Sequence, residues 1–261
     1  MGTLAILRLW GPDAHDALAE TDARLHRLES LWSRFRPDSD VSRLNRASGS
    51  WTEVAPETAL LLERAAALQE ETAGAFDVTL GTGLGRPVAV RGGKARLPAG
   101  AALDLGGIGK GAAVQDLLDG LRRRHVEAAL VSLGRSSIGL LGTPPGRDHW
   151  RVGLGPTGPS RAGAALLLGE GHLSTSGAGR ASRTIEPVRG EPAASDVRTA
   201  TVLCADGARA EALSTALVVL GTTARLTSRV AGFEAVLTDH DGVRTCTPGI
   251  RTGLRRSTGD T

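Results

Sequence analysis

Short apolar runs, each long enough for one strand, occur in groups along this chain of 261 residues and do not alternate strictly with helical patterns. They cover residues 3–9, 88–90, 95–97, 128–133, 138–141, 150–154, 164–168, 199–203, 235–237 and 243–245. Strands that follow one another without an intervening helix favour an α+β fold over a doubly wound parallel sheet. Because no stretch has the composition of a linker, we predict a single domain at residues 1–252, with helices packed on mostly antiparallel strands, and a flexible polar tail at residues 253–261.

Four segments have the apolar spacing of helices. Leucines and a tryptophan between residues 18 and 32 predict the first helix, which should end before Pro37. The others are expected at about residues 56–74, 109–124 and 208–220. Two polar stretches do not follow this pattern. Residues 33–45 (SRFRPDSDVSRLN) are expected to be irregular, and residues 173–177 (LSTSG), taken alone, favour a surface loop.

Composition excludes several classes of protein. Hydrophobic residues make up 41% of the chain and charged residues 23%, which is the usage of a globular protein. Apolar runs fall short of the roughly 18–20 residues that a membrane-spanning helix needs. Cys204 and Cys246 are too few for a disulfide framework or a thiolate zinc cluster. Since the first residues lack the pattern of a signal peptide, we expect a cytoplasmic protein, with an extracytoplasmic location if the true start lies upstream.

The charge pattern does not favour nucleic-acid binding. The formal net charge is only +3, the arginines are scattered, and the chain has four Trp, three Phe and no Tyr to stack on bases. The histidines do not show the spacing of a zinc site, and the G-x-S-x-G pattern of serine hydrolases does not occur. Candidate catalytic or ligand-binding residues must therefore be sought in other polar motifs.

Residues 104–111 (DLGGIGKG) form the sharpest of these motifs. A glycine turn that enters a helix exposes backbone N–H groups at the positive end of the helix dipole, which favours phosphate binding. Lys110 adds a positive charge there, in a chain whose other basic residues are nearly all arginine. The motif is not a Walker A sequence, because Gly111 follows the lysine where Ser or Thr is required. The alternative interpretation is a tight turn with a solvated lysine.

A second motif lies in the helix predicted at residues 208–220. Glu211, Ser214 and Thr215 share one face, and hard oxygen ligands of this kind suit Mg²⁺ together with phosphate oxygens. The alternative interpretation is a solvated glutamate with hydroxyls that face neighbouring backbone.

Several segments, in the same order across residues 1–237, resemble motifs of the FAD:protein FMN transferases, the ApbE-like flavin transferases. They are Met1-Gly2-Thr3, residues 33–45, residues 74–79 (similar to G-x-F-D-x-T), residues 104–111 (similar to D-L-G-G-I-A-K-G), residues 150–154, Thr175-Ser176-Gly177, Ile185-Glu186-Pro187 and residues 210–215 (similar to A-D-A-L-S-T). The resemblance implies an enzyme that binds FAD and Mg²⁺, cleaves the pyrophosphate, moves FMN onto a Ser or Thr hydroxyl of an acceptor flavoprotein and releases AMP.

The same resemblance implies roles for particular residues. Catalytic roles would fall to Glu211, Thr215 and Lys110. The metal ligands would be the backbone carbonyl of Gly107 and the side chains of Glu211, Ser214 and Thr215. The FAD-binding residues would be Met1, Phe35, Ala75, Phe76, Asp77, Asp104, Lys110 and Ile185, with Ile185 packed on the flavin.

The chain also departs from the family pattern. Glu211 stands where the family usually has Asp, Phe35 where it usually has Tyr, and Gly134-Arg135-Ser136 where it has G-G-D. Arg183 stands where the family has a His, and an arginine cannot act as a base at neutral pH. Two further hypotheses therefore stay open. One is a degenerate FAD-binding protein that delivers flavin without transfer, and the other is an FAD pyrophosphatase that releases FMN and AMP.

Overall fold

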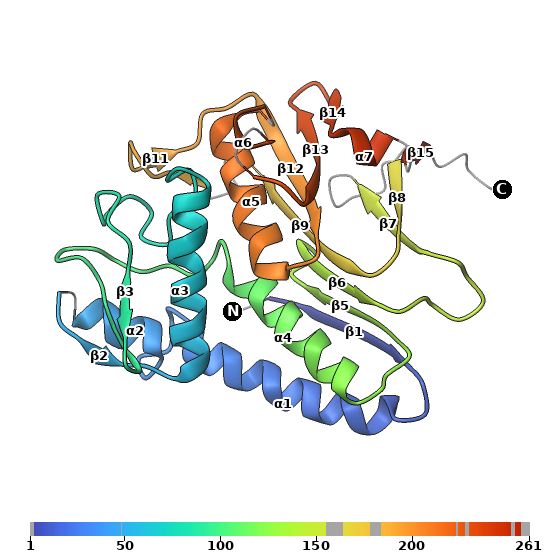
Figure 1. Ribbon diagram of the computed structural model, residues 1–261, viewed down its shortest axis with the longest axis horizontal. Helices are drawn as coiled ribbons and strands as arrows, with labels where there is room; N and C mark the ends of the chain where they lie inside the picture. The colour runs from blue at the N-terminus through green and yellow to red at the C-terminus, as the bar shows by residue number, and fades with distance from the viewer. Residues whose placement is uncertain are drawn as a thin grey trace.

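A seven-stranded sheet forms the centre of the computed structural model, which describes residues 3–47, 49–154, 164–177, 184–222, 224–227, 230–251 and 254–256 (Figure 1). Its strand order is β1-β5-β6-β9-β12-β13-β14, and each neighbouring pair is antiparallel. The strands are β1 (Ala5–Trp10), β5 (Ala128–Leu133), β6 (Ser137–Leu141), β9 (Gly171–Gly177), β12 (Val197–Cys204), β13 (Phe233–Asp239) and β14 (Arg244–Cys246). The predicted α+β class with mostly antiparallel strands is confirmed.

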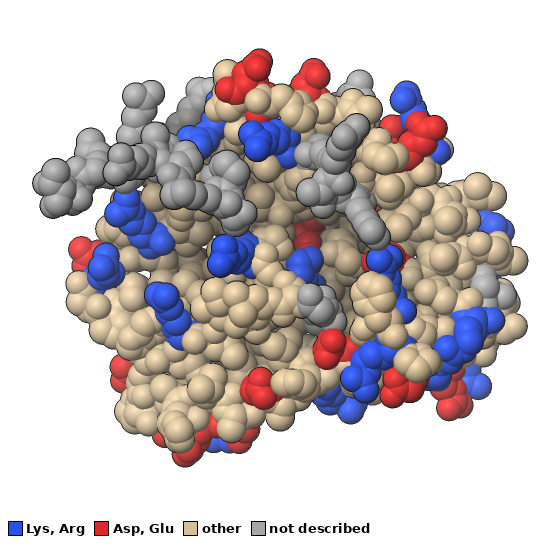
Figure 2. Space-filling view, turned by 180° about the vertical axis from the view of Figure 1, so that it is seen from behind, with Lys and Arg blue, Asp and Glu red and all other residues tan. Residues whose placement is uncertain are grey.

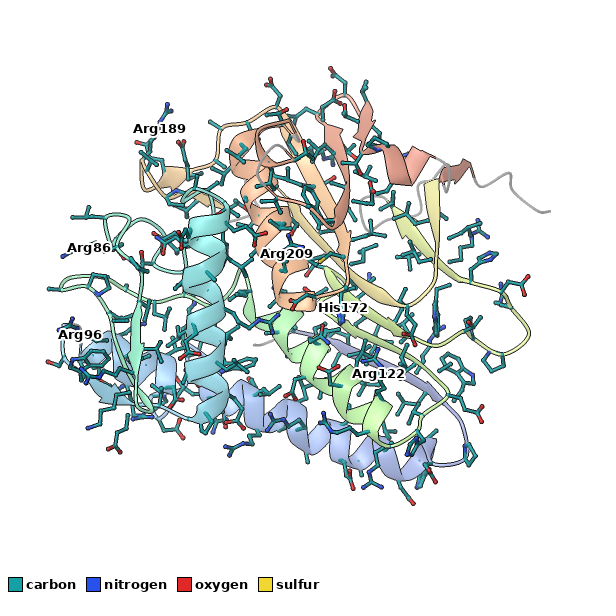
Figure 3. All side chains as sticks on the ribbon, viewed as in Figure 1. Arg86, Arg96, Arg122, His172, Arg189 and Arg209 are labelled. Atoms are coloured by element: carbon teal, nitrogen blue, oxygen red, sulfur yellow. The ribbon has the colours of Figure 1, made fainter. Side chains whose placement is uncertain are left out.

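Helices cover one face of this sheet. Here α4 (Gly109–Arg123) and α5 (Gly207–Leu220) lie on the strands, and α1 (Ala14–Trp32) packs against α4 (Figure 1). The remaining helices are α2 (Asp40–Arg46), α3 (Pro56–Glu71), α6 (Ala224–Thr227) and α7 (Pro248–Arg251). Arg209 at the start of α5, labelled in Figure 3, joins α3 through a 2.6 Å ion pair with Glu71. This layer of helices brings distant parts of the chain onto one side of the sheet.

A smaller sheet covers the other face. It consists of β7 (Trp150–Leu154), β8 (Ala164–Leu168) and β15 (Leu254–Arg256), in the order β15-β8-β7. The alternation of side chains along β5 explains the two layers, because Ala129 and Val131 pack with α4 while Ala128 packs with the cluster around Trp150. Leu254–Arg256 pair with β8, so these three residues of the predicted polar tail are a strand and not a loose segment.

Two hairpins lie outside these layers. In the first, β3 (Ala89–Arg91) and β4 (Lys94–Arg96) are joined by Gly92-Gly93, whose φ angles of 56° and 71° match the glycine hairpin turn predicted from the sequence. The short strand β2 (Thr52–Glu53) pairs with β4. In the second, β10 (Ile185–Glu186) pairs with β11 (Glu191–Pro192).

The structure corrects the interpretation of both polar stretches. Residues 40–46 form helix α2, which begins where the side chain of Ser39 accepts a hydrogen bond from the N–H of Ser42, and which buries Val41 and Leu44. Residues 173–177 belong to β9, the middle strand of the large sheet, and not to a surface loop. The hydroxyls of β9 form hydrogen bonds with Ser214 of α5 and with Thr201 of β12, which explains how a polar segment can occupy this position.

The surface carries charges of both signs. Figure 2 shows Lys and Arg side chains interspersed with Asp and Glu side chains over the face turned away from the viewer of Figure 1. In the part of the chain that the structure describes, no helix is both long and apolar enough to span a bilayer.

Candidate functional site

Most of the residues predicted to bind or transform a ligand line one cleft of about 870 Å³. The glycine turn before α4, the first residues of α4, the middle of α5, the end of β9 and the β10–β11 hairpin all contribute to its wall. The predicted residues among its lining are Ala75, Phe76, Asp77, Asp104, Gly107, Lys110, Ile185, Glu211 and Thr215. Met1 lies outside the described residues, and so does Arg183.

The glycine turn is held in shape by its own polar groups. Asp104 Oδ1 accepts the N–H of Gly106 at 2.7 Å, and Lys110 Nζ donates to the carbonyl of Gly106 at 3.0 Å. Helix α4 then begins at Gly109, and Ile108 at its N-cap position provides no side-chain hydrogen bond. Its positive dipole end therefore lies beside Lys110 at the wall of the cleft, an arrangement that favours an anionic ligand.

An ion pair connects the two central helices. The Lys110 ammonium donates to Glu211 Oε1, and the other carboxylate oxygen accepts the N–H of Gly111 at 2.5 Å. Glu211 is only 3% exposed, so its charge depends on these partners. The contact is possible because α4 and α5 cross closely. A side-chain carbon added to Gly111 would overlap the carbonyl oxygen of Gly207.

Hydroxyl groups of α5 lie next to this carboxylate. Thr215 lines the cleft, donates to the carbonyl of Glu211 at 3.0 Å, and lies 3.2 Å from Ser176 Oγ. A side-chain carbon at Gly107 would be 3.5 Å from Thr215 Oγ1, so the glycine turn and α5 approach each other here. Gly107, Glu211 and Thr215 therefore line the same cleft, with Gly107 and Thr215 close together. Carbonyl, carboxylate and hydroxyl oxygens are hard ligands of the kind that Mg²⁺ prefers.

Ser214 lies in a different environment from its predicted metal-ligating neighbours. It is fully buried and is not part of the cleft wall. Its hydroxyl donates to the carbonyl of Glu211 at 2.9 Å and lies 2.8 Å from Ser176 Oγ and 3.4 Å from Ser174 Oγ. These contacts place Ser214 between α5 and β9, behind the residues that face the cleft.

Arg34 belongs to the site although the sequence analysis did not identify it. It lines the cleft, and its guanidinium pairs with Asp104 Oδ2 at 2.7 Å. The same guanidinium lies 4.8 Å from the ring centroid of Phe35, a cation–π contact. Phe35 is 76% exposed and lines a smaller adjoining pocket of about 120 Å³ together with Asp104 and Lys110. The available signal was an arginine directly before the aromatic residue of residues 33–45.

Two other polar residues of the motifs hold the backbone of the cleft. Asn45 forms a pair of hydrogen bonds with Leu103, accepting its N–H at 2.6 Å and donating to its carbonyl at 3.0 Å. Asp77 is buried, and its carboxylate accepts the backbone N–H of Thr79 at 2.8 Å and of Gly81 at 3.3 Å. Asn45 thus fixes the chain just before the glycine turn. Asp77 shapes the neighbouring loop, where the carbonyl of Val78 accepts the N–H of Asp104 at 2.8 Å.

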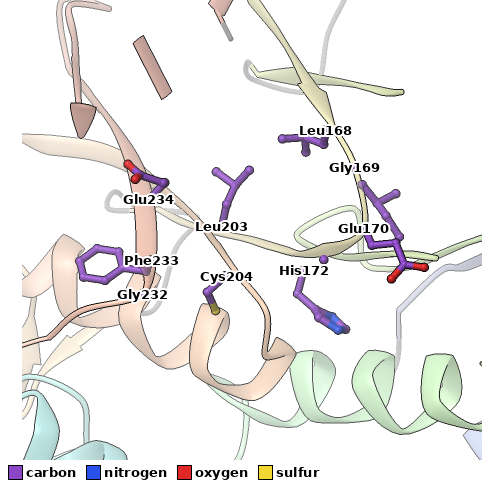
Figure 4. Close-up of a pocket in the computed structure, with 11 residues that line it drawn as sticks. Leu168, Gly169, Glu170, His172, Leu203, Cys204, Gly232, Phe233 and Glu234 are labelled. Atoms are coloured by element: carbon purple, nitrogen blue, oxygen red, sulfur yellow. The ribbon is translucent and has the colours of Figure 1, made fainter. Parts of the chain in front are cut away.

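A second pocket, of about 360 Å³, contains none of the predicted site residues (Figure 4). His172 and Cys204 are among the residues that line it. Burial lowers the pKa of His172 to about 4, and within the described part of the chain its Nδ1 has no hydrogen-bond partner. Burial also raises the pKa of the Cys204 thiol. Among the described residues, no group of three or more His, Cys, Asp or Glu side chains could hold a metal ion.

The cleft, with a glycine turn at a helix start, a lysine, a buried carboxylate and hydroxyls, has the chemistry of a site for a ligand that carries phosphate groups. The chain belongs to the ApbE family, whose model matches residues 1–98 and 86–237. It is 29% identical to the FAD:protein FMN transferase of Treponema pallidum (strain Nichols), over 85% of this chain and 77% of that protein.

Solved structures show the same fold. The ApbE protein of Thermotoga maritima is 23% identical, with a TM-score of 0.83 over 97% of this chain and 96% of that chain. The flavin transferase ApbE of Vibrio cholerae is 24% identical, with a TM-score of 0.83 over the same shares of the two chains. The flavinyl transferase ApbE of Pseudomonas stutzeri is 24% identical, with a TM-score of 0.81 over 99% of this chain and 98% of that chain.

Proposed function

We propose that this protein transfers FMN from FAD to a Ser or Thr hydroxyl of an acceptor flavoprotein, in a Mg²⁺-dependent reaction that releases AMP. The observation that carries the proposal is the pairing of Lys110 and Glu211 in the wall of the cleft beside the glycine turn. The name of the Treponema pallidum relative, FAD:protein FMN transferase, supports the same activity.

The reaction is a phosphoryl transfer. The acceptor oxygen forms a bond to the phosphorus of the FMN half, the bond from that phosphorus to the bridging oxygen breaks, and AMP leaves with that oxygen while the hydroxyl proton is lost. Such transfers depend mainly on positioning and on stabilisation of developing negative charge. Lys110 and the start of α4 supply positive charge on one wall of the cleft.

The donor set fits a magnesium ion. The carbonyl of Gly107, the carboxylate of Glu211 and the hydroxyl of Thr215 would hold it, and a bound Mg²⁺ would neutralise charge on the pyrophosphate oxygens. Ser214 would support these ligands indirectly, because its hydroxyl donates to the backbone carbonyl of Glu211.

The remaining polar residues would bind the rest of FAD. Asp104 and Arg34 form a charged pair beside the exposed ring of Phe35, and Ala75, Phe76 and Asp77 lie in the same cleft. We place the adenosine half on this side. Ile185 of β10 lines the cleft and would pack on the flavin.

The test is an FAD titration with and without Mg²⁺, followed in the same sample by AMP release and by mass spectrometry of added acceptor flavoproteins. We expect Mg²⁺-dependent AMP together with acceptor that carries covalent FMN. Free FMN and AMP without labelled acceptor would instead establish an FAD pyrophosphatase. FAD binding without AMP, across several acceptors and with both Mg²⁺ and Mn²⁺, would establish the flavin carrier that Arg183 and Arg135 suggest.

A further inference from the structure

A groove of about 1,030 Å³ adjoins the cleft and shares Asp77 and Pro187 with it. One wall is the end of α3 and the residues after it, including Ala66, Ala73 and Gly74. The other walls are the loop at residues 81–87 and the turn of the β10–β11 hairpin. Small and apolar residues dominate this lining, so an extended chain could approach the backbone of the groove closely.

The rim of the groove carries the two most exposed large hydrophobic side chains of the described residues. Val188 is 88% exposed and Leu84 is 80% exposed, and both line the groove. Single exposed apolar residues are common on protein surfaces, but two of them in one groove beside a ligand cleft indicate a binding surface.

Backbone contacts hold the two sides of the groove together. A side-chain carbon at Gly81 would overlap the carbonyl oxygen of Pro187, so the loop and the hairpin pack in direct backbone contact. The N–H of Gly190 donates to the carbonyl of Glu186 at 2.9 Å and closes the hairpin turn. Asp77 fixes the start of the loop through the N–H groups of Thr79 and Gly81. Because both sides are already ordered, a ligand would not have to order them.

We propose that this groove receives the segment of the acceptor protein that flanks the target Ser or Thr. The inference rests on the proposed function, since a direct transfer requires the acceptor hydroxyl to enter the cleft. Asp77 and Pro187 line both spaces, so the groove and the cleft adjoin there, and a chain that lies in the groove ends beside the cleft. The occupant is an extended segment with apolar residues next to the hydroxyl, which would cover Leu84 and Val188.

Two arginines lie at the edge of this groove but do not line it. Arg86 and Arg189, labelled in Figure 3, belong to the loop and to the hairpin turn that form the rim. Arg86 donates to the carbonyl of Gly83 at 3.3 Å, and Arg189 lies 3.6 Å from Glu186. Both side chains therefore contact groups of their own loop or hairpin. We expect the apolar residues between them to bind the acceptor segment.

The test compares the double variant Leu84→Ser/Val188→Ser with the wild type and with Leu60→Ser/Val243→Ser. The control residues are 59% and 62% exposed and line neither groove nor cleft. At saturating FAD, we expect the groove variant to raise the KM for the acceptor about tenfold, because two apolar contacts are lost. The affinity for FAD should stay within twofold, and the control variant should match the wild type.

A second measurement does not depend on turnover. Fluorescence anisotropy would follow a labelled peptide that carries one Ser flanked by Ala, Val and Leu, and a matched peptide flanked by Asp and Lys. We expect the apolar peptide to bind the wild type more tightly than the charged one, and to bind the groove variant at least fivefold more weakly.

The outcomes separate the two proposals. An unchanged acceptor KM with unchanged peptide binding in the groove variant would overturn the docking surface while leaving the transferase intact. A groove variant that loses FAD affinity would also overturn it, since the groove would then belong to the nucleotide site. If the wild type releases no AMP, the proposed function fails, and the peptide measurement alone decides whether the groove binds an apolar chain.

Discussion

The cleft and the pocket around His172 place ionisable side chains in different surroundings. In the cleft, the carboxylate of Glu211 accepts hydrogen bonds from the Lys110 ammonium and from the N–H of Gly111. In the pocket, burial lowers the pKa of His172 to about 4, so its imidazole is neutral at physiological pH.

Glycines account for both environments. A side-chain carbon added to Gly207 would overlap the carbonyl oxygen of Gly111 and would also lie 2.9 Å from His172 Nδ1. The start of α5 therefore packs closely against both α4 and the imidazole, which is buried. A cavity with an ionisable side chain is consequently not evidence of chemistry by itself, whereas a buried pair of charges that faces an open cleft is a stronger indication.

The largest expected effect is a loss of activity when the carboxylate in the cleft is replaced. Glu211→Gln should lower the rate of AMP release at least 100-fold, because it removes the charge that pairs with Lys110 and one oxygen of the proposed metal site. Single-turnover assays with FAD and Mg²⁺ would measure this. The exposed Glu63→Gln on α3 is the matched control, and a loss of less than threefold in Glu211→Gln would contradict the assignment of the cleft.

The buried His172 of the pocket should instead affect how the free energy of unfolding depends on pH. The folded-state pKa of His172 is lowered from 6.5 to about 4, so the unfolded chain binds the proton first as the pH falls. Stability from this group is fully present above pH 6.5 and is lost as the pH decreases towards 4, by up to about 3 kcal/mol. Urea unfolding at pH 7, 5.5 and 4.5 would detect the change, and His172→Leu should flatten that part of the profile. An unaltered slope in the variant would show that other groups govern it.

The close packing of α4 on α5 at Gly111 and Gly207 can be tested by adding a single methyl group. Gly111→Ala should destabilise the protein by about 1–3 kcal/mol, because the added carbon overlaps the backbone of Gly207. Gly120→Ala in the same helix meets only the end of the Arg123 side chain at 3.8 Å and should be neutral or stabilising. Denaturant midpoints of the two variants would measure this difference, and equal midpoints would show that the crossing can relax.

The smallest effect concerns Ser214. Its buried hydrogen bonds to Glu211 and β9 predict that Ser214→Ala costs about 1 kcal/mol of stability and leaves the Mg²⁺ concentration for half-maximal activity within twofold. Thr215→Ala, at the cleft wall, should raise that Mg²⁺ concentration. If Ser214→Ala raises it as much as Thr215→Ala does, the serine contacts the metal directly.

Local patterns located two parts of this cleft, the glycine turn at residues 104–111 and the polar face of α5, and left alternatives open for each. The resemblance to the flavin transferases implied that the two act together, and in the structure Gly107 closely approaches Thr215. The pairing of Arg34 with Asp104 was not predictable, because the two residues are 70 positions apart and nothing in either segment specifies the other.

The central strand β9 was missed for a related reason. A half-buried strand is recognised by apolar residues on alternate positions. In β9 the inward positions of Ser174 and Ser176 are hydroxyls, which are satisfied by Ser214 and Thr215 of a helix that comes much later in the chain. A hydropathy pattern detects apolar side chains and does not show which hydrogen-bond partners a polar side chain will have in the fold. A strand whose core contacts are hydrogen bonds therefore looks like a loop in the sequence.

The distance along the chain between Lys110 and Glu211 has a consequence for synthesis. The two residues are 101 positions apart, and β5, β6, β9 and β12 of the large sheet lie between them in the chain. During translation the first half of the chain therefore emerges with its glycine turn but without its carboxylate. Because the cleft needs both groups, a nascent chain would gain its affinity for a phosphate-bearing ligand only after α5 has left the ribosome.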